Sequence, residues 1–306
     1  MLWHINDLCN FGCVYCFFPK VEKEHPEVGR FTPQQIYEAF QKTGRNWHLF
    51  ISGGEPLLYP DFIELVNLLK TNHPIQISTN LYNKNVKEFA ERVSPENIIV
   101  INASLHILHH NSKSLQKFIS NYHLFLNKGF DIIVSYVTYP PLFKRIKDDF
   151  LFLKNEGVQY VLPCTYNGTF EGKKYPGSYT REQMRIIREI YQEPLELLVV
   201  MDKMHFYNKL CRAGKDYFFM DLKGEVFRCC TIWDSYGNLY QGTFKPDTSA
   251  KPCTSHICHD HCHGMMSLIE EPQPPEEEFY ENGFFREMTI KSLDIVSRMK
   301  KSLQSV

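Results

Sequence analysis

The feature that most constrains the fold is an alternation of short apolar runs with longer helical patterns over the first two thirds of the chain. Six runs have strand character: Leu2–Ile5, His48–Ser52, Ile75–Thr79, Ile98–Ala103, Ile132–Tyr139 and Val158–Pro163. The helical patterns are Pro33–Thr43, Phe62–Lys70, Asn85–Val93, Lys113–Lys128, Phe143–Glu156 and Arg181–Tyr191. Strands that alternate with helices pair in parallel, because each helix carries the chain back across the sheet. We therefore expect an α/β fold with a parallel sheet, open or barrel-like, with its chemistry at the carboxyl ends of the strands.

Local signals mark the ends of several helices. Thr32, Asp61 and Thr180 each precede a helical pattern, where an N-cap residue would stand. Gly129 and Gly157 follow two of the patterns, and glycine is common just past a helix end. These residues support the predicted helix boundaries.

Composition narrows the class of protein. The chain has 306 residues, 34 Lys+Arg against 35 Asp+Glu, and a formal net charge of -1. Its length allows a large domain and a smaller one, and its balanced charge argues against a nucleic-acid or membrane surface. The sequence has no run of about 18 apolar residues, and its N-terminus lacks the basic and apolar regions of a signal peptide. We expect a cytoplasmic protein.

Ten cysteines are therefore informative, because disulfides are rare in the cytosol and such chains more often bind metal or carry out redox chemistry. Cys164 separates two clusters. They are Cys9, Cys13 and Cys16 near the start, and Cys211, Cys229, Cys230, Cys253, Cys258 and Cys262 late in the chain. The spacing predicts a core domain over residues 1–200, a metal-binding domain over 201–270, and an acidic Pro-rich linker with a C-terminal helix over 271–306.

The first cluster stands in a loop after the first strand, at the carboxyl edge of the sheet. Three thiolates suit iron–sulfur or zinc coordination, and three ligands leave one metal position for a substrate. The alternative is a zinc knuckle completed by His4 or His25. A second motif, Ser-Gly-Gly-Glu-Pro at residues 52–56, follows the second strand, so that glycine backbone and a carboxylate meet the same edge.

This combination resembles the radical S-adenosylmethionine (SAM) superfamily over about residues 1–190. The matching features are Cys-x3-Cys-x2-Cys, the aromatic Tyr15, and Gly53-Gly54-Glu55-Pro56. The resemblance implies a partial (β/α)6 TIM-like barrel in which the three cysteines bind three irons of a 4Fe-4S cluster and SAM chelates the fourth. Gly54 and Glu55 would meet the methionine amine, and Tyr15 the adenine. Looser matches to SAM contacts are Gly53, Thr79, Asn80 and Ser104.

The late cysteines resemble an auxiliary-cluster extension, called SPASM with two clusters and twitch with one. Cys211, Gly224 and Cys229 match its Cys-x12-Gly-x4-Cys half, within a predicted hairpin of residues 217–220 and 225–228. No cysteine follows Cys262, so we expect a small α+β domain with one auxiliary 4Fe-4S cluster. The preferred ligands are Cys211, Cys229, Cys258 and Cys262, with Cys253 competing for either of the last two and Cys230 spare. The alternative is zinc, because His256, His259, His261 and His263 interleave with these cysteines.

Cys164 ends the sixth predicted strand and would face the triad. A thiol there could give a hydrogen atom to a substrate radical; the alternative is a small buried residue, which is common for free cysteine. His106, Tyr136 and Tyr139 are strand-end candidates for substrate contact, or else core residues.

The resemblance implies reductive cleavage of SAM to a 5′-deoxyadenosyl radical that takes a hydrogen atom from a small molecule or a peptide side chain. Oxidation, epimerisation or cross-linking would follow, with a flavodoxin or ferredoxin as reductant. Only eight residues precede Cys9, whereas peptide-modifying relatives often carry a leader-binding domain there; this favours the small-molecule alternative. Competing hypotheses are a zinc-stabilised binding protein without catalysis and a plain electron carrier.

Overall fold

The computed structural model describes residues 1–17, 31–191, 194–201 and 204–258. Within them, nine strands form one sheet in the order β12-β11-β10-β1-β2-β3-β4-β5-β6. The strands of the first part are β1 (Leu2–His4), β2 (Leu49–Ser52), β3 (Ile75–Thr79), β4 (Ile98–Ser104), β5 (Ile132–Val137) and β6 (Val161–Cys164). They pair in parallel and in sequence order. The expected α/β fold with a parallel sheet is confirmed.

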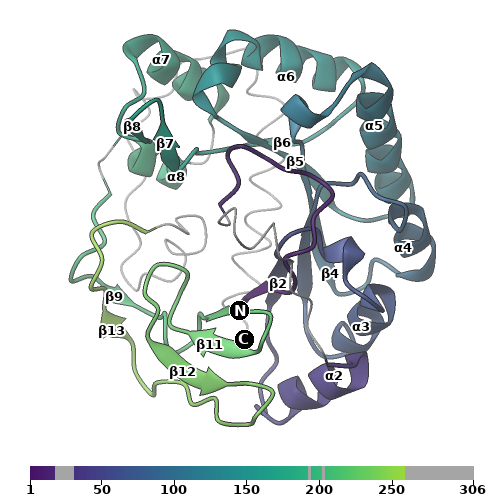
Figure 1. Cartoon of the computed structure of the whole chain (residues 1–306), viewed down its shortest axis with the longest axis vertical. Helices are drawn as coiled ribbons and strands as arrows, with labels where there is room; N and C mark the ends of the chain where they lie inside the picture. The colour runs from purple at the N-terminus through teal and green to yellow at the C-terminus, as the bar shows by residue number, and fades with distance from the viewer. Residues whose placement is uncertain (18–30, 192–193, 202–203, 259–306) are drawn as a thin grey trace.

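In the part of the chain that the structure describes, five helices cover the outer face of this curved sheet (Figure 1). They are α2 (Pro33–Gln41), α3 (Phe62–Leu69), α4 (Val86–Arg92), α5 (Ser112–Asn127) and α6 (Ile146–Asn155); α7 (Arg181–Ile190) and α8 (Pro194–Val200) follow after the last parallel strand. Short 3-10 turns η1 (Pro56–Leu58), η2 (Ile107–His109) and η3 (Pro140–Lys144) follow the carboxyl ends of β2, β4 and β5. Each strand end is therefore continued by a loop on the inner side, where a ligand can be reached.

The three predicted N-cap residues all precede their helices, but only two of them make a side-chain cap hydrogen bond. Thr32 and Thr180 both form capping boxes with the glutamine three residues later. Asp61, by contrast, has a φ of 53° and its side chain makes no cap hydrogen bond. Gly129 and Gly157 have φ values of 87° and 77°, which is the left-handed conformation expected after a helix end.

Most observed boundaries lie within two residues of the predicted ones, and two differ by more. The segment predicted as one helix from Phe143 is split into η3 and α6, because Arg145 has a φ of -129° between them. Two prolines open η3, where their missing N–H groups cost nothing. The last parallel strand begins at Val161 rather than at the predicted Val158.

The second part of the chain extends the same sheet past β1. The predicted hairpin is present as β10 (Phe219–Met220) and β11 (Glu225–Phe227), which pair antiparallel, and β12 (Ser235–Asn238) follows at the edge. β10 pairs in parallel with β1, with Leu2 opposite Phe219. The late cysteine segment is therefore joined to the core through β1.

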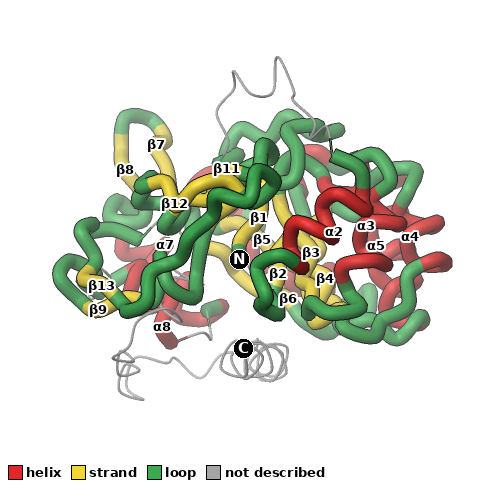
Figure 2. The backbone as a smooth tube through the Cα atoms, turned by 90° about the horizontal axis from the view of Figure 1, so that it is seen from below, coloured by secondary structure: helices red, strands yellow, loops and turns green. Residues whose placement is uncertain are grey.

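Two small sheets complete the described structure. β9 (Leu210–Cys211) pairs with β13 (Lys251–Pro252), and β7 (Gly168–Phe170) pairs with β8 (Lys173–Tyr175). Figure 2 shows β7 and β8 standing out from the sheet. Among the described residues, no helix is both long and apolar enough to cross a bilayer. The predicted linker and C-terminal helix lie outside the described residues.

The core lies between the parallel sheet and its helices. Trp3 of β1 meets Phe40 of α2 edge-on, with ring centroids 5.8 Å apart. Phe89 of α4 stacks on Phe62 of α3 and on Phe125 of α5, each at 5.9 Å. Full burial of such a side chain is worth about 1.5–3 kcal/mol, so the helices hold the strands, and with them the strand ends, in place.

Candidate active site

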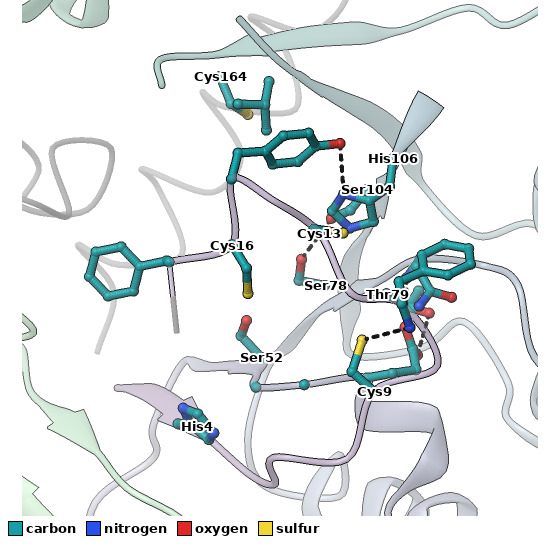
Figure 3. A pocket seen from close by; sticks show the side chains of 18 of the residues that line it. His4, Cys9, Cys13, Cys16, Ser52, Ser78, Thr79, Ser104, His106 and Cys164 are labelled. Carbon is teal, nitrogen blue, oxygen red and sulfur yellow. Dashed lines mark hydrogen bonds between the residues drawn. The ribbon is translucent and has the colours of Figure 1, made fainter. Parts of the chain in front are cut away.

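A cavity of about 330 Å³ lies at the carboxyl ends of the parallel strands. This volume is in the range of small-molecule pockets, roughly 300–1,000 Å³. It is lined by every core residue that the sequence assigned to the cluster, to SAM or to hydrogen donation: Cys9, Cys13, Tyr15, Cys16, Gly53, Gly54, Glu55, Thr79, Asn80, Ser104 and Cys164. Figure 3 shows the cysteines of the loop after β1 on one side and Cys164 across from Cys9.

The two glycines after β2 lock the triad loop by backbone contact. The amide of Gly54 donates to the carbonyl of Asn6, and the amide of Glu55 donates to that of Leu8, both at 2.6 Å. A Cβ on Gly54 would lie 2.2 Å from the Leu8 carbonyl oxygen, and Gly53 has a φ of 143°. Only glycine allows this approach, so residues 53–54 determine where the chain enters the cysteine loop.

Glu55 places a carboxyl group in the cavity wall. Its Oε1 accepts from the Thr79 hydroxyl at 2.6 Å, and its Oε2 accepts from the Asn80 amide at 2.7 Å. The side chain is buried, and this burial raises its pKa to about 7 although hydrogen bonds from Thr79, Asn80 and Leu57 oppose the rise. A carboxylate kept in such a position favours a cation beside it.

The triad thiols differ in exposure: Cys9 is exposed, Cys16 half-buried and Cys13 buried. The amide of Phe11 donates to Cys9 Sγ at 3.4 Å, and the amide of Cys16 donates to the Cys13 carbonyl at 3.1 Å. Hydrogen bonds from N–H groups to sulfur, such as the one from Phe11, influence the reduction potential of iron–sulfur clusters. The loop therefore offers three sulfur ligands beside open space.

The donor set fits an iron–sulfur cluster. Within the part of the chain that the structure describes, no three Cys, His, Asp or Glu side chains meet closely enough to hold a single metal ion. A cluster takes one thiolate per iron, so its ligands need not meet at one point. His4, the candidate fourth zinc ligand, has Nε2 2.6 Å from Asp7 Oδ1, and His25 lies outside the described residues.

Tyr15 lies between the triad loop and the far strands. Its hydroxyl is 3.3 Å from His106 Nδ1, and its ring centroid is 5.3 Å from that of Tyr139. Burial, together with the neighbouring thiols of Cys13 and Cys16, raises its pKa well above the usual value. The ring is thus a neutral aromatic wall of the cavity.

Polar side chains of the central strand ends form a hydrogen-bonded row. Ser104 Oγ lies 3.2 Å from Ser78 Oγ and 3.4 Å from Ser135 Oγ. Asn80 Nδ2 donates to Asn10 Oδ1 at 2.7 Å, which ties the strand end to the cysteine loop. The row offers hydroxyl and amide groups to a polar ligand.

Of the four candidates for substrate contact, two line the cavity and two do not. Cys164 lines the cavity half-buried, with Sγ 3.7 Å from the Leu162 carbonyl, and His106 lines it too. Tyr136 is fully buried and donates to Asp149 Oδ2 at 2.6 Å, so it is a core residue. Tyr139 packs its ring against that of Tyr15.

Sequence reasoning missed several cavity residues. They are Asp7, Phe11, Phe17, Ser52, Ser78, Val137, Thr165, Tyr166 and Asn167, with His4 considered only as a zinc ligand. The available signal was position: each lies at, or just beyond, a predicted strand end or within the triad loop. Residue type alone did not separate them from rim residues.

Four late cysteines line a second, apolar pocket: Cys211, Cys229, Cys253 and Cys258. Lys251 stands opposite Cys211 in the β9–β13 pair, and the amide of Cys253 donates to the Lys209 carbonyl at 2.8 Å. This pairing brings Cys253 into the group, whereas the preferred prediction left it spare. Cys230 is buried but does not line the pocket, and Cys262 lies outside the described residues.

The second pocket also presents N–H groups to sulfur. The amide of Ala213 donates to Cys211 Sγ at 3.4 Å, and that of Ile232 donates to Cys229 Sγ at 3.3 Å. Burial raises the pKa of both thiols. His256, one of the predicted zinc alternatives, stacks on Tyr207 at 4.5 Å, and the other three histidines lie outside the described residues.

Comparisons with known proteins agree with this geometry. Residues 3–152 match the model of the radical SAM superfamily. The mycofactocin maturase MftC of Mycobacterium ulcerans is 28% identical over 106 residues, which cover 34% of this chain and 28% of that protein. The 7-carboxy-7-deazaguanine synthase of Methanothermobacter thermautotrophicus is 40% identical over 75 residues, 24% of this chain and 29% of that protein. The chain thus matches less than a third of the length of either relative.

Solved structures share the fold. Native anSMEcpe with bound AdoMet has a TM-score of 0.60 at 16% identity and covers 99% of this chain, which covers 99% of it. Streptococcus suis SuiB bound to S-adenosylmethionine has a TM-score of 0.58 at 15% identity, with 78% of this chain and 63% of SuiB covered. At such identities the likeness is one of fold.

Proposed function

We propose that this chain, whose residues 3–152 match the radical SAM superfamily model, is a radical SAM enzyme of the maturase type that oxidises, epimerises or cross-links a peptide side chain. The observation that carries the proposal is the single cavity that joins three loop thiols, the Gly-Gly-Glu turn and the polar strand ends. When bound, a 4Fe-4S cluster and SAM would supply an electron and the 5′-deoxyadenosyl radical that takes a hydrogen atom from the substrate.

The chain's own residues have distinct tasks in this proposal. Cys9, Cys13 and Cys16 bind three irons. Glu55, held by Thr79 and Asn80, accepts the amine of SAM, because a buried carboxylate favours a neighbouring cation. The backbone at residues 53–54 lies close enough to meet the methionine part.

The far wall would position the remaining parts of the ligands. Tyr15 faces the adenine, and Ser104 offers a hydroxyl to the ribose or methionine part. Tyr139 and Tyr166 meet edge-on with ring centroids 5.1 Å apart. Tyr15 and Tyr166 line the cavity, and their rings would limit the access of water to a radical formed there.

Several of the proteins that resemble this one support a peptide substrate, whereas the 7-carboxy-7-deazaguanine synthase relative is named for a small molecule. MftC is named a maturase, anSMEcpe has been solved with a Kp18Cys peptide, and SuiB has been solved with its precursor peptide SuiA. In this chain the wall beyond Cys164 continues as Thr165, Tyr166 and Asn167, whose polar groups are suited to a peptide backbone.

We further propose one auxiliary 4Fe-4S cluster on Cys211, Cys229, Cys253 and Cys258. These thiols share one apolar pocket, which supports Cys253 as a ligand; Cys262, the fourth ligand of the preferred set, lies outside the described residues. Four cysteine ligands leave no open iron, which favours electron transfer or structural support over substrate binding. In this scheme residues 1–200 are the catalytic domain, residues 201–270 the twitch/SPASM-like domain, and residues 271–306 a linker and helix.

The proposal also includes a flavodoxin- or ferredoxin-type reductant in the cytoplasm, because SAM cleavage consumes an electron. The alternative is a zinc-stabilised binding protein without catalysis, and a metal analysis would distinguish it from the enzyme. It would contain zinc, lack sulfide and leave SAM intact.

One experiment tests the proposal. The protein is purified without oxygen, its iron, sulfide and zinc are counted, and it is reduced with dithionite in the presence of SAM. Two clusters correspond to about eight irons and eight sulfides per chain, and 5′-deoxyadenosine should form. Zinc without sulfide, or two clusters without 5′-deoxyadenosine, would refute the enzyme assignment.

A further inference from the structure

Arg228 is a buried arginine in the wall of the second cysteine pocket. It stands between β11 and Cys229, and only 4% of its surface is exposed. It lines the same pocket as Cys211, Cys229, Cys253 and Cys258. An arginine is rarely buried to this extent without a partner of opposite charge.

The guanidinium contacts the backbone of the other cysteine segments. Its Nε donates to the Ala213 carbonyl at 3.3 Å, two residues after Cys211. Its Nη2 donates to the carbonyls of Lys251 and Pro252 at 3.1 and 2.8 Å, directly before Cys253. One side chain therefore ties together the strands that carry three of the four thiols.

All three of these hydrogen bonds go to uncharged backbone carbonyl oxygens. Among the described residues, no carboxylate lies within ion-pair distance of Arg228. The carboxylate of Asp247 accepts from the Lys251 ammonium at 2.6 Å and from the Tyr236 hydroxyl at 2.5 Å, and the charges of both Lys251 and Arg228 help to lower its pKa. Arg228 therefore shares this acid with Lys251 at a distance, and a buried charge that is paired only in part favours a further anion beside it.

The thiolates of the pocket are the anions within reach. Each cysteine ligand binds metal as a thiolate, and a cluster on four thiolates carries a net negative charge that increases when it is reduced. A cation fixed beside it stabilises the reduced form more than the oxidised form, because the attraction grows with the cluster's charge.

We propose that Arg228 is the counter-charge of the auxiliary metal site, and that it raises the reduction potential of the cluster bound there while positioning the Cys211 and Cys253 strands. The inference rests on the proposed auxiliary cluster. It predicts the sign of the effect on the reduction potential: with Arg228 beside it, the cluster accepts an electron more readily than it would with no cation nearby.

The test uses the full chain with Cys9, Cys13 and Cys16 replaced by alanine, so that only the second site is loaded. Its cluster is titrated potentiometrically, with the visible spectrum and electron paramagnetic resonance as readouts. Arg228→Gln removes the charge but keeps a hydrogen-bonding side chain, and Arg228→Lys keeps the charge. Arg212→Gln is the matched control, because Arg212 is an exposed arginine beside Cys211.

We expect Arg228→Gln to lower the equilibrium constant for one-electron reduction about tenfold, which is ~59 mV for a one-electron couple. Arg228→Lys should shift it much less, and Arg212→Gln should leave it unchanged. Loss of the cluster from Arg228→Gln but not from Arg228→Lys would also support the counter-charge.

An intact cluster with an unchanged potential in Arg228→Gln would overturn the inference, as would equal effects of Gln and Lys. Failure of the auxiliary cluster itself looks different. In that case the parent triad variant, with Arg228 in place, would contain no sulfide.

Discussion

The two cysteine sites differ in what surrounds their sulfur atoms. In the first, thiols that range from exposed to buried lie on one short loop beside a cavity of about 330 Å³ with polar walls. In the second, four thiols from three separate segments line an apolar pocket with a buried arginine. Three ligands beside open space leave a metal position for a ligand, whereas four ligands in an apolar pocket leave none. The two cysteine sites are therefore distinguished by the surroundings of their sulfur atoms more than by their number of cysteines.

Removing the triad should have the largest effect. With Cys9, Cys13 and Cys16 replaced by alanine, we expect loss of about four irons and of all 5′-deoxyadenosine formation, since no open iron remains. The second cluster should stay, because its pocket shares no residue with the cavity. Iron and sulfide analysis checks both statements. If all iron disappeared, the two sites would not be independent.

Replacing Cys253 tests the second cysteine site. Cys253→Ala should remove most of the second cluster's iron and leave the first intact, because Cys253 lines the pocket with Cys211 and Cys229. Cys230→Ala is the matched control, being equally a late cysteine but outside the pocket. Iron content and the visible spectrum are the readouts. A cluster lost from Cys262→Ala but retained in Cys253→Ala would restore the original ligand set.

The backbone contact at Gly54 should matter only to the first site. Gly54→Ala places a Cβ 2.2 Å from the Leu8 carbonyl, so the triad loop must shift, at a cost of about 1–3 kcal/mol. Gly12→Ala is the control, because nothing lies within 4 Å of a Cβ there. We expect a lower melting temperature and weaker SAM cleavage from the first variant alone. Equal behaviour of the two variants would contradict this account of the turn.

Glu55 should make the cavity sensitive to pH. Its carboxyl group has a pKa of about 7 in the fold, raised from 4.5 by burial. The unfolded chain therefore loses this proton first, and the ligand-free protein should lose stability as pH rises from about 4.5 to 7, by up to about 1.4 kcal/mol per pH unit. In the Glu55→Gln variant, the melting temperature should change less with pH over this range, and thermal unfolding at several pH values measures it.

The same group should govern SAM affinity. The ionised carboxylate binds a cation better, so wild-type affinity should rise with pH up to about 7 and then level off. Glu55→Gln should bind SAM at least about tenfold more weakly, since a hydrogen bond to a charged group is worth about 1.5–3 kcal/mol. Calorimetry from pH 6 to 8 measures both effects. Parallel pH profiles for the two proteins would place the amine elsewhere.

Cys164 should have the smallest effect on SAM cleavage. Its thiol lines the cavity from the end of β6, on a different element from the three loop cysteines, so Cys164→Ser should form 5′-deoxyadenosine at the wild-type rate. The informative measurement is deuterium from D2O in the peptide product. Deuterium incorporation that disappears in Cys164→Ser would identify a hydrogen-atom donor and an epimerase. Unchanged incorporation would leave Cys164 a wall residue.

Much of the fold could be predicted from the sequence because its signals are local. Apolar runs, the capping residues Thr32 and Thr180, and the glycines after two helices act within a few residues of themselves. The errors occurred where local signals compete. The break at Arg145 splits one predicted helix, and Asp61, although it precedes its helix as predicted, takes a left-handed conformation and makes no side-chain cap.

The sequence by itself predicted a parallel sheet alternating with helices, and it supplied the hypothesis for the chemistry of the first site. The three cysteines lie close together in the chain, as do the two glycines, so spacing carries the information. Only the tertiary structure decided which late cysteines meet, because the β9–β13 pair joins segments far apart in sequence and brings Cys253 to Cys211. It also decided that Arg228 is buried beside them and that Tyr136 is core. Contact, burial and charge pairing between distant segments are consequences of packing, which no local pattern records.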